Sequence, residues 1–242
     1  MSPLRGVSLL LFSIALSTVT TVTSFSTNAQ FRRPQLSLRR PPQHAKLHAL
    51  KDDLSSAAAD VTDRVANTDY SVLLSRVASN LGDGSGEDRG EIFVVGQFSL
   101  LLLVLCGGIP FVDGSGGALL AVGSISSLLA SLFFIIGGAL QLGPNLTPFP
   151  KPTSDNQLRT DGVYKLVRHP IYGGLLFFCF GVAGITNSAP RFFLSLTLLL
   201  VLDSKVRAEE AWLRGKHGAA YDAYVEAVPA ALVPLLVDPK KV

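Results

Sequence analysis

Two clusters of polar side chains interrupt an otherwise apolar sequence, and both contain groups that can bind charged molecules. The stretch "GVYKLVRHPIYGG", residues 162–174, places an Arg-His pair directly before a proline. Proline is favoured in the first turn of a helix, so Arg168 and His169 should lie at a helix mouth. Free backbone N–H groups and the helix dipole favour an anion there, and a guanidinium can grip a carboxylate or phosphate. The positively charged flank of a membrane helix would explain Arg168 and Tyr172, but not the whole cluster.

The second cluster is the acidic pair Glu209-Glu210 within "DSKVRAEEAWLRGKHG", residues 203–218. Adjacent side chains on a helix point about 100° apart, so one carboxylate can face inward while its neighbour flanks it. The alternative is a solvated helix in which Lys205 pairs with Glu209, and Glu210 pairs with Arg214. Further along, "YDAYVEAVPAALVP" predicts a short surface helix that ends at prolines.

The overall composition is that of an integral membrane protein. Of the 242 residues, 48% are hydrophobic and only 16% are charged, and the mean hydropathy is +0.39. The apolar residues also come in blocks. A formal net charge of +3 without a basic stripe argues against nucleic-acid binding. No zinc-ligand spacing, glycine-rich phosphate loop or Ser-His-Asp arrangement is present in the sequence. His44 and His48 have helical metal spacing, but they lie in a proline-flanked basic segment, so we expect no metal.

Four apolar segments are expected to form the membrane domain. The segments 92–112 and 118–142 are each long enough to span a bilayer, whereas 171–185 and 192–202 are shorter and joined by a turn. The sequence therefore predicts an all-α integral membrane helical bundle. It has about four transmembrane helices, the last two forming a short hairpin, followed by a C-terminal surface helix.

Basic residues suggest that both polar clusters lie on one side of the membrane. They concentrate in the connection 143–170 and in the C-terminal tail, namely Lys151, Arg159, Lys165, Arg168, Lys205, Arg207, Arg214 and Lys216. The positive-inside tendency places these two regions on the same face. The Arg-His pair and the acidic pair can then meet.

The N-terminal part of the chain resembles an address rather than a folded domain. Arg5 precedes a short apolar core, which predicts a signal peptide over residues 1–24. Residues 25–51 contain six basic residues and no acidic one, and are transit-peptide-like. The tandem resembles the two-part presequence of algae with secondary plastids and predicts a plastid membrane. An uncleaved anchor with a basic linker, or an endoplasmic reticulum location, is the alternative.

Residues 52–91 are expected to form an amphipathic helix and a linker. Apolar residues recur at helical spacing from Asp52 to about Leu81, with a break near Asn67. A solvated leader is the alternative. Residues 92–242 would be the membrane domain.

A family resemblance follows from the spaced combination of motifs. "LRTDGVYKLVRHPIYGG", a short apolar hairpin, "RAEEAWL" and "YDAYVEAVP" together strongly resemble the isoprenylcysteine carboxyl methyltransferase and phospholipid methyltransferase superfamily. The upstream "LGPNLTPFPKP" resembles that family's lead-in, so the resemblance covers about Leu142 to Pro234. The combination is far more specific than any one motif.

The resemblance implies a membrane methyltransferase that uses S-adenosylmethionine. The implied acceptor is a lipophilic small molecule, a lipid or a prenylated substrate. By similarity, Arg168, His169 and Tyr172 are candidate catalytic residues, and the cofactor-binding residues are Tyr164, Arg168, His169, Tyr172, Gly174, Glu209 and Glu210. The helix mouth suits the cofactor's carboxylate, and a Glu suits its ammonium.

The sequence departs from the family near the VP step, where basic residues often follow, as in "VPR". Glu226, Ala227 and Ala230 occupy this region, which puts prenylcysteine in doubt as the substrate. Two alternatives stay open. One is a sterol-reductase-like or haem-dependent isomerase-like membrane enzyme, with His169 as a nicotinamide or haem contact. The other is a non-catalytic plastid membrane protein of the same fold. The sequence leaves the acceptor and the oligomeric state open.

Overall fold

The computed structural model describes residues 43–82, 89–106, 118–151 and 157–234, and these residues form helices joined by loops without a β-strand. The predicted all-α class is confirmed. The signal peptide, most of the transit-peptide-like segment and the turn after the first apolar segment lie outside the described residues.

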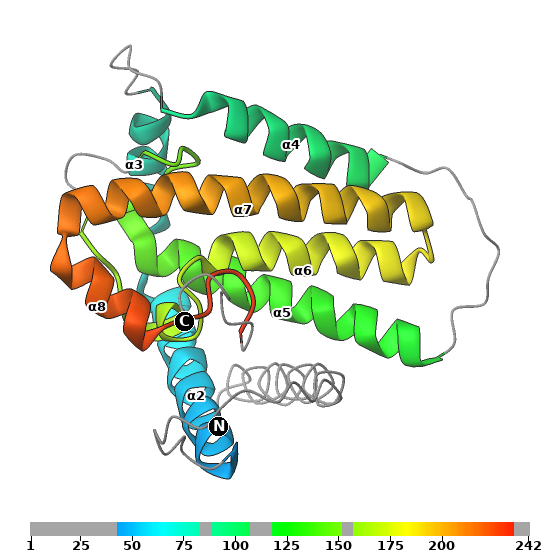
Figure 1. The fold of residues 1–242 in the computed structure, drawn as a ribbon, viewed down its shortest axis with the longest axis horizontal. Coiled ribbons are helices and arrows are strands. Elements are labelled where there is room, and N and C mark those ends of the chain that lie inside the picture. The colour runs from blue at the N-terminus through cyan, green and yellow to red at the C-terminus, as the bar shows by residue number, and fades with distance from the viewer. Residues whose placement is uncertain (1–42, 83–88, 107–117, 152–156, 235–242) are drawn as a thin grey trace, which may run out of the picture.

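Four long helices lie side by side and form the body of the protein (Figure 1). They are α4 (Glu91–Cys106), α5 (Ala118–Leu142), α6 (Pro170–Ile185) and α7 (Ala189–His217). α6 lies between α5 and α7, and α4 packs along the other side of α7. The mouth of α6 and the polar half of α7 therefore meet at one end of the bundle.

Small residues allow α5 and α6 to pack closely. A Cβ atom added at Gly174 would lie 2.7 Å from Ile135 Cγ1, and one added at Gly181 would lie 2.8 Å from Leu128 Cγ. Both contacts are too short for a larger side chain without rearrangement, and small residues are typical of close helix contacts in membranes. Gly174 thus contributes to helix packing.

α7 is one continuous helix, as expected from the absence of a helix breaker after the last apolar segment. Ser188 caps its start by accepting a hydrogen bond from the backbone N–H of Arg191. The helix runs past Leu202 into the acidic pair and ends at His217, and the next residue, Gly218, has a φ of 54°, which suits glycine. The short helix α8 (Ala219–Ala227) then folds back on the bundle and buries Tyr221 and Tyr224.

Two helices precede the bundle, α2 (Gln43–Asn67) and α3 (Tyr70–Gly82), and the gap between them falls at the break expected near Asn67. α2 is not a solvated leader, because Leu54 and Ala57 are buried in the same core as Val163 of η2 (Gly162–Lys165). α2 also begins inside the transit-peptide-like segment, and Leu50 packs against this core. Residues 43–51 are therefore part of the same helix as the residues that follow, and the predicted boundary at residue 51 falls inside this helix.

One segment in the described residues is long and apolar enough to cross a membrane. It is Leu120–Asn145, which comprises most of α5 and the turn η1 (Gly143–Asn145), while α4 and α6 are apolar but shorter. Many large apolar side chains on the four long helices are exposed, including Ile92, Val95, Leu102, Val122, Phe193 and Leu200. Such apolar surface is typical of contact with lipid. One of the four predicted spans thus meets the criteria of length and composition.

Candidate active site

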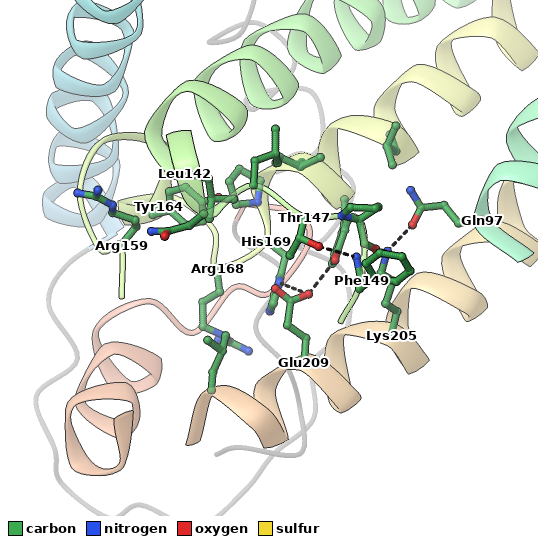
Figure 2. Close-up of a pocket in the computed structure, with 18 of the residues that line it drawn as sticks. Gln97, Leu142, Thr147, Phe149, Arg159, Tyr164, Arg168, His169, Lys205 and Glu209 are labelled. Carbon is green, nitrogen blue, oxygen red and sulfur yellow. Dashed lines mark hydrogen bonds and ion pairs between the residues drawn. The ribbon is translucent and has the colours of Figure 1, made fainter. Parts of the chain in front are cut away.

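A cavity of about 390 Å³ lies where the mouth of α6 meets the polar half of α7. Figure 2 shows Arg159 and Tyr164 toward one side of it, Lys205 and Gln97 toward the other, and His169 with Glu209 between them. Five of the seven residues expected to bind the cofactor line this cavity: Tyr164, Arg168, His169, Tyr172 and Glu209. Gly174 packs against α5 instead, and Glu210 lies behind Arg168.

Arg168 and Glu210 form a buried ion pair, although 42 residues separate them in sequence. Arg168 Nε lies 2.9 Å from Glu210 Oε1, and their side chains are only 1% and 5% exposed. Arg168 Nη1 also donates to the Val228 carbonyl at 2.7 Å. A buried charge requires such compensation. Glu210 therefore fixes the orientation of Arg168.

The second carboxylate, Glu209, faces the cavity. Its Oε2 accepts a 2.7 Å hydrogen bond from the Tyr172 hydroxyl and lies 3.9 Å from His169 Nδ1. The His169 ring stacks on Tyr172, with ring centroids 5.6 Å apart. The Glu209 side chain is 24% exposed, against 5% for Glu210. The expected division between an inward and a flanking carboxylate is thus present. The Glu210–Arg214 pair of the solvated-helix alternative is also present, with Arg214 Nη2 3.6 Å from Glu210 Oε2, but Glu210 itself is buried rather than solvated.

The C-terminal tail reaches the site through its backbone rather than through basic side chains. The Arg168 N–H donates to the Ala230 carbonyl at 3.0 Å, and the His169 N–H donates to the Ala231 carbonyl at 2.9 Å. A Cβ atom at Gly173 would overlap the carbonyl oxygen of Leu232. Because carbonyl groups make these contacts, the absence of a basic residue after the VP step does not prevent the tail from closing over the helix mouth.

Three buried tyrosines form the wall on the η2 side. Tyr164 donates to the Gly138 carbonyl at 3.4 Å, and the Tyr224 hydroxyl donates to the Tyr164 carbonyl at 2.7 Å. Burial, followed by the nearby Glu209 carboxylate, raises the pKa of Tyr164 well above its usual value. Burial also raises the pKa of Tyr221 and of Tyr224. These phenols stay neutral over the physiological range.

Four buried polar atoms of the described residues lack a hydrogen-bond partner, namely Arg159 Nε, Arg168 Nη2, His169 Nε2 and Tyr221 Oη, although His169 Nε2 lies 3.5 Å from Glu210 Oε1. All four residues line the same cavity. Buried polar groups are nearly always paired, so several unpaired ones around one cavity indicate a polar ligand. The two guanidinium groups among them favour a ligand with an anionic group.

Sequence reasoning missed three polar residues of the cavity wall. Arg159 was expected only as a positive charge at the membrane surface. Lys205 was expected there too, or as the partner of Glu209 on a solvated helix, yet it is fully buried. Gln97 lies in α4, far from both sequence clusters, and hydrogen-bonds to Lys205. A polar residue inside an apolar segment was the available signal for Gln97. No local signal distinguishes a buried lysine from an exposed one on a charged helix.

Comparison with known proteins agrees with this geometry. Residues 120–220 match the family model of phospholipid methyltransferases. They belong to the isoprenylcysteine carboxyl methyltransferase and phospholipid methyltransferase superfamily. The chain is also 33% identical over 87 residues to the protein-S-isoprenylcysteine O-methyltransferase of Schizosaccharomyces pombe.

The match covers 36% of this chain and 36% of the yeast protein, so the chain spans about a third of the length of this curated relative. No solved structure matches the chain. Residues 120–220, the superfamily segment, contain Arg168, His169, Glu209 and Glu210. Gln97 and the tail carbonyls lie outside this segment.

Proposed function

We propose that this protein is an integral membrane methyltransferase that transfers a methyl group from S-adenosylmethionine to a lipophilic acceptor at the membrane surface. The observation that carries the proposal is the meeting of the Arg168-His169 mouth and the Glu209-Glu210 pair in one cavity, with unpaired polar atoms around it. The superfamily membership of this segment supports the same activity.

The cavity has groups of the correct charge for both ends of the donor's amino-acid part. The unpaired nitrogens of Arg159 and Arg168 suit a carboxylate. Glu209, the carboxylate that faces the cavity, suits an ammonium. Glu210 is already occupied by Arg168 and acts by holding it. When bound, S-adenosylmethionine supplies a methyl group activated by a positively charged sulfur.

The protein's part in the reaction is chiefly to position the reactants and exclude water. Methyl transfer is an in-line displacement, and rate is gained when the two reacting atoms are held in line. Tyr172 orients Glu209 through the 2.7 Å hydrogen bond. His169 is the imidazole at the cavity and can accept a proton from a protonated acceptor. These roles make Arg168, His169 and Tyr172 the proposed functional residues.

Apolar side chains favour a lipophilic acceptor. The cavity is also lined by Val77 and Leu81 of α3, Phe98 and Leu101 of α4, and Leu175 of α6. Such a wall suits a hydrocarbon chain. The acceptor class thus extends to a lipid, a prenylated substrate or another lipophilic small molecule. No contact in the described residues favours the reductase-like or isomerase-like alternative.

The proposal includes four membrane crossings and a plastid membrane. Exposed apolar side chains on α4 and α7, besides α5, support the additional crossings. The two-part N-terminal segment supports the plastid location.

The test is methyl transfer by the purified chain in lipid nanodiscs. Radiolabelled S-adenosylmethionine is added with a plastid lipid extract, and the labelled product is identified by chromatography and mass spectrometry. We expect label in a lipophilic product with the wild type and loss of label with Glu209→Gln. Glu226→Gln, an exposed carboxylate on α8, is the matched control. A wild-type protein that neither binds the donor nor transfers label would overturn the proposal.

A further inference from the structure

Lys205 occupies an unusual place for a lysine, because it has no exposed surface and borders the cavity. Its Nζ donates to Gln97 Oε1 of α4 at 2.7 Å and to the Pro148 carbonyl at 2.7 Å. It also lies 4.7 Å from the centroid of the Tyr172 ring. An ammonium has three hydrogens. Two hydrogen bonds and one aromatic face therefore surround it on three sides.

These contacts connect Lys205 to the cavity-facing carboxylate. The Tyr172 ring lies next to the ammonium, while the Tyr172 hydroxyl donates to Glu209 Oε2 at 2.7 Å. Lys205 and Glu209 are four residues apart on α7, so they lie one turn apart on the same side of that helix. Figure 2 shows Gln97, Lys205 and Glu209 on neighbouring parts of the cavity wall. Lys205 can thus fix the position of the Tyr172 ring, and the Tyr172 hydroxyl in turn fixes the Glu209 carboxylate.

A side chain that served only to fill this space would not need a charge. Burial of an ammonium is unfavourable unless nearby groups compensate for lost hydration. Burial lowers the pKa of Lys205 to about 8, and the attraction of Glu209 opposes this shift. A buried, perturbed titratable group that borders a cavity is characteristic of functional sites.

We propose that Lys205, held in place by Gln97 of α4, is a positioning residue of the methyl-donor site and acts through Tyr172 on Glu209. The proposal rests on the proposed function and extends the site beyond the superfamily segment, because Gln97 precedes residue 120. Helix α4 is then a component of the donor site as well as of the membrane bundle.

The charged and titratable groups around Lys205 are few in the described residues. α7 contributes Glu209, and α6 with its mouth contributes Tyr172 and His169. α4 contributes the uncharged Gln97. The loop that contains Pro148 and Phe149 also lies beside Lys205, and Arg89 faces this loop, with its guanidinium 4.2 Å from the Phe149 ring centroid. A change in the charge of Lys205 should therefore be transmitted mainly to Glu209.

The test measures donor affinity as a function of pH for the full chain in nanodiscs, by equilibrium dialysis with radiolabelled S-adenosylmethionine. Lys205→Met should raise the dissociation constant about tenfold near pH 7, because Tyr172 without the ammonium beside its ring no longer holds Glu209 through its hydrogen bond, and one such bond is worth about this factor. The ratio of variant to wild-type constants should fall toward one above pH 8, where the wild-type lysine loses its charge. The donor's own amine titrates near pH 8 in every sample, so the ratio isolates Lys205.

A second variant keeps the lysine and changes only its environment. Gln97→Glu preserves size and places a carboxylate beside the ammonium, which raises the lysine pKa. Above pH 8, this variant should therefore lose less of the donor affinity that it has at pH 7 than the wild type loses. Lys216→Met, an exposed lysine on the same helix, is the control and should change neither value.

The outcomes separate the two proposals. Without donor binding by the wild type, the proposed function itself fails. If the wild type binds the donor, two results would each overturn the positioning role while the proposed function stands. One is a dissociation constant of Lys205→Met that equals that of the wild type at every pH. The other is a Gln97→Glu variant that loses donor affinity over the same pH range as the wild type. Should Lys205→Met fail to fold, the Gln97→Glu result decides.

Discussion

The two adjacent glutamates should respond very differently to the same substitution. Glu210→Gln removes the partner of a buried arginine, since Arg168 and Glu210 are 2.9 Å apart and both nearly unexposed. Breaking a buried pair in this way destabilises a protein by about 3–5 kcal/mol. For a chain of this size, that loss corresponds to a fall in Tm of roughly 6–20 °C.

Glu209→Gln should instead change affinity more than stability. Glu209 is part-exposed in the cavity and keeps a hydrogen-bonding oxygen for Tyr172 after substitution. Loss of a charged contact to the donor's ammonium is worth about 1.5–3 kcal/mol, which weakens donor binding roughly 10- to 100-fold. We expect its Tm to stay close to that of the wild type.

Thermal unfolding in detergent and donor binding in nanodiscs measure the two effects separately. The double substitution of Arg168 and Glu210 by methionine provides a further check, because an apolar pair of similar volume can restore stability. It should regain much of the lost Tm without regaining donor affinity. Equal Tm losses for Glu209→Gln and Glu210→Gln, or wild-type stability of Glu210→Gln, would show that the assigned division between the glutamates is wrong.

Four further predictions concern single substitutions. Gly173→Ala should lower the free energy of unfolding by about 1–3 kcal/mol, because the new methyl group overlaps the Leu232 carbonyl. Gly215→Ala, which has open space around it on α7, should raise it by about 0.5–1 kcal/mol in the same denaturation assay. Tyr172→Phe removes the 2.7 Å hydrogen bond to the cavity-facing carboxylate and should weaken donor binding about tenfold, with little change in Tm. Because the pKa of Lys205 is lowered from 10.5 to about 8, the unfolded state binds more protons between these values, so Lys205 makes stability rise with pH through this window. Lys205→Met should remove this rise of stability with pH. An unchanged pH dependence of the free energy of unfolding would contradict the lowered pKa of Lys205.

Much of the site could be predicted because it is encoded locally. A proline after Arg168-His169 sets the start of α6, and the helix indeed begins at Pro170. Adjacent glutamates on a helix must point in different directions, whatever surrounds them. The absence of a breaker after the last apolar segment predicted that α7 continues into the acidic pair. Basic residues predicted that both clusters lie on one membrane face, and the Arg168–Glu210 pair does bring the two clusters together.

Contacts between distant segments decided the rest. Which glutamate faces the cavity depends on Arg168, 42 residues away, and the burial of Lys205 depends on Gln97, 108 residues away. The tail closes the helix mouth through carbonyl groups, which every residue type carries. Helical periodicity and motif spacing describe one segment at a time, so the sequence alone determined the helices and the chemical groups they carry. Only the packing of the bundle determined which of those groups are buried, paired or left facing a ligand.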